Sequence, residues 1–367
     1  MEVNRSEMHF NQRIESLRGL AALAVAITHS VAVFHVDGLP NIWVVPFADQ
    51  PFSVRVITLV ITVFNAEAAV ILFFVISGYV LALSIKRSGA QIAAMPSYLA
   101  RRAFRLFPAM WVSIAVFWLI THAVRPDSLN GFTAWFISVF GSAPSVGDAL
   151  RNLLLLDFRS NPVTWTMLVE VVGSFCIPAL VFIAVRFGRG GAALAMAALT
   201  LLAAVAYPNL VFTYLFCFCA GVVFASFPIT IPMPGLALFV GFTLFMLERG
   251  VVEGGLAGLL VNALGSCLIL AAVLCGRNGT AFLEWRPIRF LGRISYSVYL
   301  IHLPLIYIVA IALKTMMSAD GLWLHLATAI LAIPLTIAVA AIMYSLIEVP
   351  SIRAGRSLSS KLVPREP

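Results

Sequence analysis

A succession of strongly apolar segments, with basic residues gathered at alternate ends of them, constrains most what this chain can fold into. Hydrophobic residues make up 61% of its 367 residues and charged residues only 11%, and the mean hydropathy is +1.00. A soluble domain of this length cannot remove so much apolar surface from water, whereas a chain that crosses a bilayer places it against lipid. Because helices satisfy their own backbone hydrogen bonds, the composition predicts an all-α, polytopic membrane protein.

Ten segments could each cross about 30 Å of hydrocarbon, which takes roughly 20 residues of helix. The first is expected to be a transmembrane helix and not a cleaved signal peptide, because charged residues lie inside its start and no small-residue cleavage site follows. The ten segments lie near residues 14–36, 66–85, 106–124, 165–185, 191–207, 210–227, 233–247, 255–275, 294–315 and 322–347.

The distribution of Lys and Arg predicts how these segments are oriented. With the N-terminus in the cytoplasm, 18 of the 24 basic residues fall in cytoplasmic segments and 6 in outer ones. Cytoplasmic loops of membrane proteins carry such an excess, so both termini are expected in the cytoplasm. The net charge of +8 then reflects topology, and no nucleic-acid partner is needed to explain it. We expect a transmembrane domain over 1–350 and a short, polar cytoplasmic tail over 351–367.

Two long outer segments, 37–65 and 125–164, connect the predicted helices. Within the second, the stretches 132–140 and 149–158 are apolar but too short to span a bilayer. These stretches could lie on the membrane surface or fold back over a site. The five cysteines all lie in apolar segments, where they are expected as small buried hydrophobic residues with neither a disulfide framework nor a metal site.

The first helix carries ionisable residues on one stripe. Arg18 and His29 are 11 residues apart, so they share a helix face and are separated by a rise of about 16 Å; Glu15 falls within about 40° of the same line. Ionisable groups at membrane depth usually mark function. The stripe resembles a groove for a long ligand with an anionic head. The plainer interpretation is a histidine satisfied by a neighbouring helix, with arginines that only set topology.

Glu170 is the second buried ionisable residue. It lies five residues after Trp165, about 8 Å along a helix that enters from outside. His29 is expected at a similar depth, so the two side chains could meet. An imidazole can act as a general base, and the carboxylate could orient it or hold a sugar hydroxyl. The alternative is a glutamate near the interface that pairs with Arg159 or with water.

Two further clusters carry polar side chains. Arg101, Arg102 and Arg105 offer planar donors that suit phosphates, although anionic lipid or topology explains them equally well. In the ninth segment Ser295, Tyr299 and His302 follow i, i+4, i+7 spacing and share a face. Hydrogen-bonded helix packing is the favoured interpretation of this second cluster, and His302 is assigned to it.

Seven patterns occur in order along nearly the whole chain. They are the first-helix pattern at 14–25, the Arg18–His29 pair, the second-helix pattern at 70–79, the basic pattern at 98–108, the 165–170 pattern, the 291–304 pattern and the closing 348–350. Together they resemble the membrane-bound acyltransferase-3 family, which includes bacterial polysaccharide and lipopolysaccharide O-acetyltransferases and Nod-factor acetylases. Glu15 stands where the family usually has aspartate, which leaves its role less defined.

The resemblance implies a bundle of about ten helices that receives acyl-CoA, with acetyl-CoA expected, from the cytoplasm. His29 is then the catalytic histidine, and Arg18, Arg101, Arg102 and Arg105 face the donor. Glu170 is taken as a catalytic residue on the acceptor side. The residues expected to contact substrate are Glu15, Ser77, Trp165 and Tyr299.

The predicted function is a membrane O-acyltransferase of the bacterial inner membrane that acts on a hydroxyl of an extracytoplasmic or lipid-linked carbohydrate. No metal is expected. His29 would deprotonate the hydroxyl, and a covalent acyl-histidine is the less favoured variant. The competing hypothesis is a proton-coupled transporter or flippase with His29 and Glu170 as a relay. Transporters commonly contain inverted repeats and interrupted helix pairs, neither of which the sequence contains.

Overall fold

The computed structural model describes residues 2–35, 47–87, 95–126, 128–250, 255–276, 279–316 and 321–362. Within these ranges the chain is helical, and its only strand-like pairing is an isolated bridge between Phe34 and Phe132. The prediction of an all-α membrane protein is confirmed. The helices are α1 (Glu2–Val31), α2 (Phe52–Val63), α3 (Ala66–Arg87), α4 (Met95–Ala123), α5 (Ala134–Phe140), α6 (Val146–Leu153), α7 (Trp165–Ala206), α8 (Leu215–Ser226), α9 (Pro234–Gly250), α10 (Gly255–Cys275), α11 (Arg286–Met316), α12 (Leu322–Met343) and α13 (Val349–Leu362).

Among the described residues, seven helical stretches are long and apolar enough to cross a membrane, and α8 and α9 are shorter apolar helices. Helix α7 contains two of the segments expected from the sequence. They adjoin at Gly188, whose φ of 63° and ψ of −153° interrupt the helix; glycine adopts this conformation without the steric cost that a side chain would add. The count of ten spans stays a prediction.

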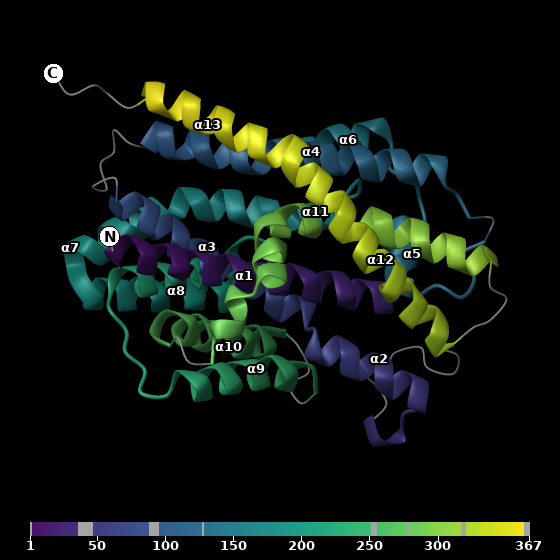
Figure 1. The fold of residues 1–367 in the computed structure, drawn as a ribbon, viewed down its shortest axis with the longest axis horizontal. Helices are drawn as coiled ribbons and strands as arrows, with labels where there is room; N and C mark the ends of the chain where they lie inside the picture. The colour runs from purple at the N-terminus through teal and green to yellow at the C-terminus, as the bar shows by residue number, and fades with distance from the viewer. Residues whose placement is uncertain are drawn as a thin grey trace.

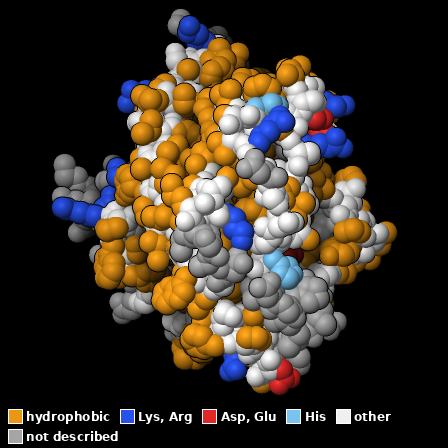
Figure 2. All heavy atoms as spheres, turned by 90° about the vertical axis from the view of Figure 1, so that its right-hand side faces the viewer, with side chains coloured by type: hydrophobic (Ala, Val, Ile, Leu, Met, Phe, Trp, Pro, Cys, Tyr) orange, Lys and Arg blue, Asp and Glu red, His pale blue; other side chains and the backbone are white. Residues whose placement is uncertain are grey.

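The long helices lie side by side along one direction, with α1 inside the bundle (Figure 1). The start of α1 and the end of α13 lie at the same end of the bundle, as termini on one side of the membrane require. That this side is cytoplasmic also stays a prediction. Figure 2 faces the opposite end and shows hydrophobic side chains over most of the surface, with few acidic ones.

Helix α1 packs most closely against α11, and two glycines make this approach possible. A Cβ placed on Gly19 would lie 2.4 Å from the backbone nitrogen of Gly292, and one on Gly292 would lie 2.6 Å from the carbonyl oxygen of Glu15. Small residues let transmembrane helices approach to backbone contact. The close packing of α1 on α11 brings His29 beside His302.

Several boundaries differ from those expected. Helix α4 begins at Met95, so the three arginines at 101, 102 and 105 lie within it and not ahead of it. The residues expected as a polar tail form α13 as far as Leu362. This helix packs along α4, since a Cβ on Gly355 would lie 2.6 Å from the Cβ of Phe104. Burial against α4 gives these residues a helical structure that their polar composition did not predict.

The segment 125–164, which the sequence predicts to lie outside, folds back onto the end of α1. Thr133 donates its backbone N–H to the carbonyl of Val33 at 2.9 Å, and its hydroxyl donates to the carbonyl of Ala32 at 2.8 Å. The backbone N–H of His35 donates to the carbonyl of Gly131 at 2.8 Å. Helix α5 follows directly and is thereby held over α1. Of the segment 37–65, also predicted to lie outside, residues 52–63 form α2, and residues 37–46 lie outside the described part. All five cysteines are free.

Candidate active site

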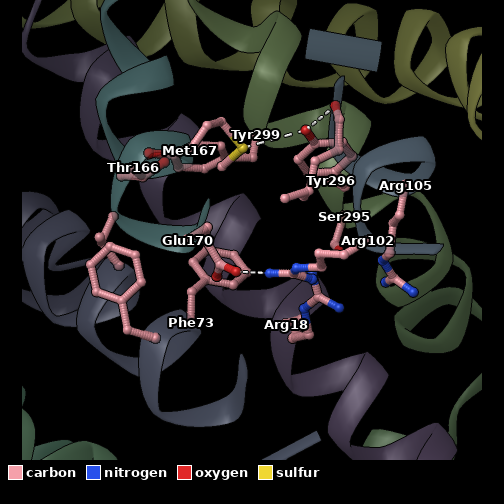
Figure 3. A pocket seen from close by; sticks show the side chains of 13 residues that line it. Arg18, Phe73, Arg102, Arg105, Thr166, Met167, Glu170, Ser295, Tyr296 and Tyr299 are labelled. Atoms are coloured by element: carbon pink, nitrogen blue, oxygen red, sulfur yellow. Dashed lines mark hydrogen bonds and ion pairs between the residues drawn. The ribbon is translucent and has the colours of Figure 1, made fainter. Parts of the chain in front are cut away.

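Two cavities meet at a cluster of arginines from α1 and α4. The basic cavity extends along the second half of α3 and includes Ser77, Tyr98 and Arg101. The aromatic cavity extends along the first half of α3. Its lining comprises Val70, Phe73, Phe74, Leu106, Thr166, Met167, Glu170, Ser295, Tyr296 and Tyr299. Arg18, Arg102 and Arg105 line both cavities, and Figure 3 shows them converging on one side of the aromatic cavity.

The carboxylate of Glu170 is held by α3 and α4. Its Oε1 accepts a hydrogen bond from the hydroxyl of Ser77 at 2.6 Å, and its Oε2 accepts from the guanidinium of Arg102 (Figure 3). Arg102 also donates from Nε to the hydroxyl of Ser174 at 3.0 Å. The carboxylate therefore stabilises Arg102. The expected contact between Glu170 and His29 is absent from the hydrogen bonds of the described residues, because Glu170 faces α3 and α4 whereas His29 faces α11.

The alternative partner that the sequence offered for Glu170 is also not used. Arg159 lies 3.7 Å from carboxylate oxygens of Asp148 and Asp157, within the outer segment.

Arg18 and Arg105 differ from Arg102 in that no described residue forms a hydrogen bond or ion pair with them. The Nε of Arg18 is enclosed without an acceptor. The buried Glu348, which accepts from the hydroxyl of Ser297, is near enough to both arginines to interact electrostatically. Guanidinium groups whose donors are not used within the protein favour an anionic ligand. These two arginines are therefore the strongest anion-binding candidates of the site.

Glu348 is a residue to which sequence reasoning gave no role. It ends a π-helical turn, Tyr344–Glu348, between α12 and α13. Such turns are rare and frequently occur at functional sites. The available sequence signal was the closing pattern at 348–350, which identifies the residue but not its place beside the arginines.

A pair of histidines lies beyond the aromatic cavity. The Nδ1 of His29 is 2.8 Å from the Nε2 of His302, and the two rings are within 8° of one plane. Trp135 of α5 covers His29, with ring centroids 5.0 Å apart and planes 18° apart. Sequence reasoning missed this role of Trp135, and the apolar stretch 132–140 was its only signal. It favoured hydrogen-bonded helix packing for His302, and the contact with His29 is a hydrogen bond of this kind between α11 and α1.

Tyr299 connects the cavity to the histidines. Its side chain lines the aromatic cavity, and its ring centroid is 5.9 Å from that of His302. Its backbone carbonyl lies 2.7 Å from the Nδ1 of His302. His29 itself lines neither of the two cavities. Arg18 and His29 therefore do not line one groove along α1, as the sequence suggested, and Tyr299 and His302 of α11 lie between the aromatic cavity and His29.

The remaining predicted residues do not all line the two cavities. Ser77 lines the basic cavity and holds Glu170, and Arg101 lines the same cavity while donating to Ser97. Trp165 packs between Phe74 and Tyr214, at centroid distances of 6.3 and 5.4 Å, outside the two cavities. Glu15 is exposed and also lies outside them.

The fold and the site define a polytopic, all-α membrane protein with a basic cavity, an adjoining aromatic cavity and a histidine pair next to Tyr299 of the aromatic cavity. The chain belongs to the acyltransferase-3 family, because the model of that family's acyltransferase domain matches residues 11–345. It is thus a membrane acyltransferase. No match was found among curated proteins, and none among solved structures.

Proposed function

We propose that this membrane acyltransferase transfers an acyl group, acetyl first of all, from cytoplasmic acyl-CoA to a hydroxyl of an extracytoplasmic or lipid-linked carbohydrate. One observation carries the proposal. Arg18 and Arg105, which form no hydrogen bond or ion pair with a described residue, line two cavities, and Tyr299 of the aromatic cavity lies beside His302, the partner of His29. Transfer from a phosphate-bearing donor requires an anion-binding site and a general base close to it.

The charge of the site supports an anionic donor. Four arginines line the basic cavity, and two carboxylates, Glu170 and Glu348, are within reach of them. Guanidinium groups bind phosphates through paired donors. The phosphates of acyl-CoA would occupy the basic cavity, and its less polar arm would extend into the aromatic cavity beside Phe73 and Met167.

The reaction needs a single base that also serves as an acid. His29 accepts the proton of the acceptor hydroxyl, and the oxygen attacks the thioester carbonyl carbon. The carbon–sulfur bond breaks as the new ester forms. His29 returns the proton to the departing thiolate, giving an O-acyl ester and free CoA. In this scheme Glu170 keeps Arg102 in place and does not exchange protons with His29.

The transporter hypothesis is not supported by the contacts of its two relay residues. It required His29 and Glu170 to exchange a proton, but Glu170 is bonded to Ser77 and Arg102, and His29 is bonded to His302. The family match adds independent support for acyl transfer.

Acyl transfer can be tested with purified protein in lipid nanodiscs. Radiolabelled acetyl-CoA is supplied with membrane glycolipids, and label in the carbohydrate fraction is measured for the wild type and for His29→Ala. We expect transfer by the wild type alone. Equal labelling by both proteins, or none by either over a range of acceptors, would refute the proposal. Mass spectrometry of surface glycans from a deletion strain would then identify the acceptor.

A further inference from the structure

We propose that His302 is a positioning residue that fixes the tautomer of His29 and leaves the Nε2 of His29 as its basic atom. The inference rests on the proposed function and names the atom that performs it. It is carried by two hydrogen bonds that run in series, from His29 to His302 and from His302 to the backbone of Tyr299.

The backbone carbonyl of Tyr299 determines which atom donates and which accepts in each of the two hydrogen bonds. The Nδ1 of His302 is 2.7 Å from the carbonyl oxygen of Tyr299, and a carbonyl oxygen can only accept, so this nitrogen carries a proton. In a neutral imidazole the other nitrogen is then an acceptor. The Nε2 of His302 therefore accepts from the Nδ1–H of His29 across 2.8 Å. A second proton on the resting pair would place a charge in the bundle interior, which is costly at membrane depth.

The ring geometry fits this bond. The two planes differ by 8° and the ring centroids are 5.1 Å apart. That separation is the length of the N···N contact plus one ring radius at each end, as two imidazoles meeting edge to edge in one plane require. The lone pair of His302 thus points along the N–H bond of His29, which is the favourable alignment for a hydrogen bond.

The Nε2 of His29 then carries no proton and keeps its lone pair. It has no hydrogen-bond partner among the described residues and is not enclosed. The Nε2 of the buried His325, by contrast, is enclosed without a partner. The lone pair of this nitrogen is therefore not engaged by a described residue and is available to an acceptor hydroxyl. Once His29 has taken the proton, its Nδ1–H still donates to His302, so the same bond stabilises the imidazolium.

The test replaces His302 with residues that either keep or remove a hydrogen-bond acceptor at the position of its Nε2. His302→Gln can present its amide oxygen there, whereas His302→Leu presents only carbon. His122→Leu is the matched control, because His122 also donates Nδ1–H to a carbonyl of its own helix, that of Trp118 at 2.8 Å, and it belongs to neither the cavities nor the pair.

Acetyl transfer, the KM for acetyl-CoA and CoA affinity are measured for each variant. We expect His302→Leu to lower kcat by about 10²–10⁴-fold with an unchanged KM, and His302→Gln to stay within about tenfold of the wild type. His122→Leu should keep the wild-type kcat. A His302→Leu protein that keeps kcat within about tenfold overturns the inference. Equal losses of kcat in His302→Leu and His302→Gln, with CoA affinity preserved, also overturn it. The hydrogen-bond acceptor that Gln retains would then make no difference to the rate.

A second measurement is independent of activity. In protein labelled with ¹⁵N-histidine, the nitrogen shifts of His29 distinguish the two neutral tautomers. We expect Nδ1–H for His29 in the wild type and in His302→Gln. An Nε2–H tautomer in the wild type would refute the inference even if transfer were efficient. If the wild type transferred nothing, the proposed function would fail, and these shifts alone would decide the tautomer.

Discussion

Replacement of single arginines should separate ligand binding from folding. Arg105 forms no hydrogen bond or ion pair with a described residue and lines both cavities. Arg105→Ala should therefore leave folding nearly intact. If Arg105 donates to a CoA phosphate, its loss removes one charge-assisted contact, which is about 1.5–3 kcal/mol or roughly 10- to 150-fold in affinity. Arg18→Ala should behave in the same way.

Arg102 should respond differently, because it forms a buried ion pair. The side chains of Arg102 and Glu170 are only 11% and 9% exposed. Removal of one partner from a buried pair typically costs about 3–5 kcal/mol, since the other charge is left uncompensated. Arg102→Ala should therefore lower both the melting temperature and CoA affinity. Glu170→Gln should lower the melting temperature while CoA binding persists, because all four arginines remain.

Calorimetric titration with CoA and thermal unfolding in the same detergent would give both quantities for each variant. Arg105→Lys serves as the conservative control, and it should restore little affinity if the contact is bidentate. Unchanged CoA affinity in both Arg18→Ala and Arg105→Ala would refute the reasoning, and these arginines would remain signals of topology. A melting temperature that falls as far in Arg105→Ala as in Arg102→Ala would refute the distinction between the two.

Three further outcomes are expected. Single cysteines at positions 130 and 95, in a cysteine-free background, should label from opposite sides of the membrane; labelling of position 130 only from the cytoplasm would overturn the topology. His29→Ala should fold and bind acyl-CoA yet lose about 10²–10⁴ in turnover, and retention of more than about a tenth of wild-type turnover would exclude a general base. Trp135→Ala should lower kcat more than Trp135→Phe does, because Phe keeps an aromatic face against the imidazolium; equal rates in the two variants would leave Trp135 with a packing role.

The sequence by itself determined the class of this protein and located its cluster of arginines. Hydropathy and basic-residue spacing are local properties, so they are sufficient to predict membrane helices and a group of guanidinium side chains that could bind phosphate. The single face shared by Arg18 and His29 also follows from helix geometry alone. The seven residue patterns, taken together and in order, indicated the family that residues 11–345 match.

Only the tertiary structure decided which of these residues act together. Glu170 pairs with Arg102, and His29 with His302, a residue 273 positions away. A helix pattern fixes the face on which a side chain lies but not the neighbour that this face meets. That neighbour depends on helix packing, here on the close approach that Gly19 and Gly292 allow between α1 and α11. The proton-carrying edge of His29 therefore depends on contacts between helices that no local pattern contains.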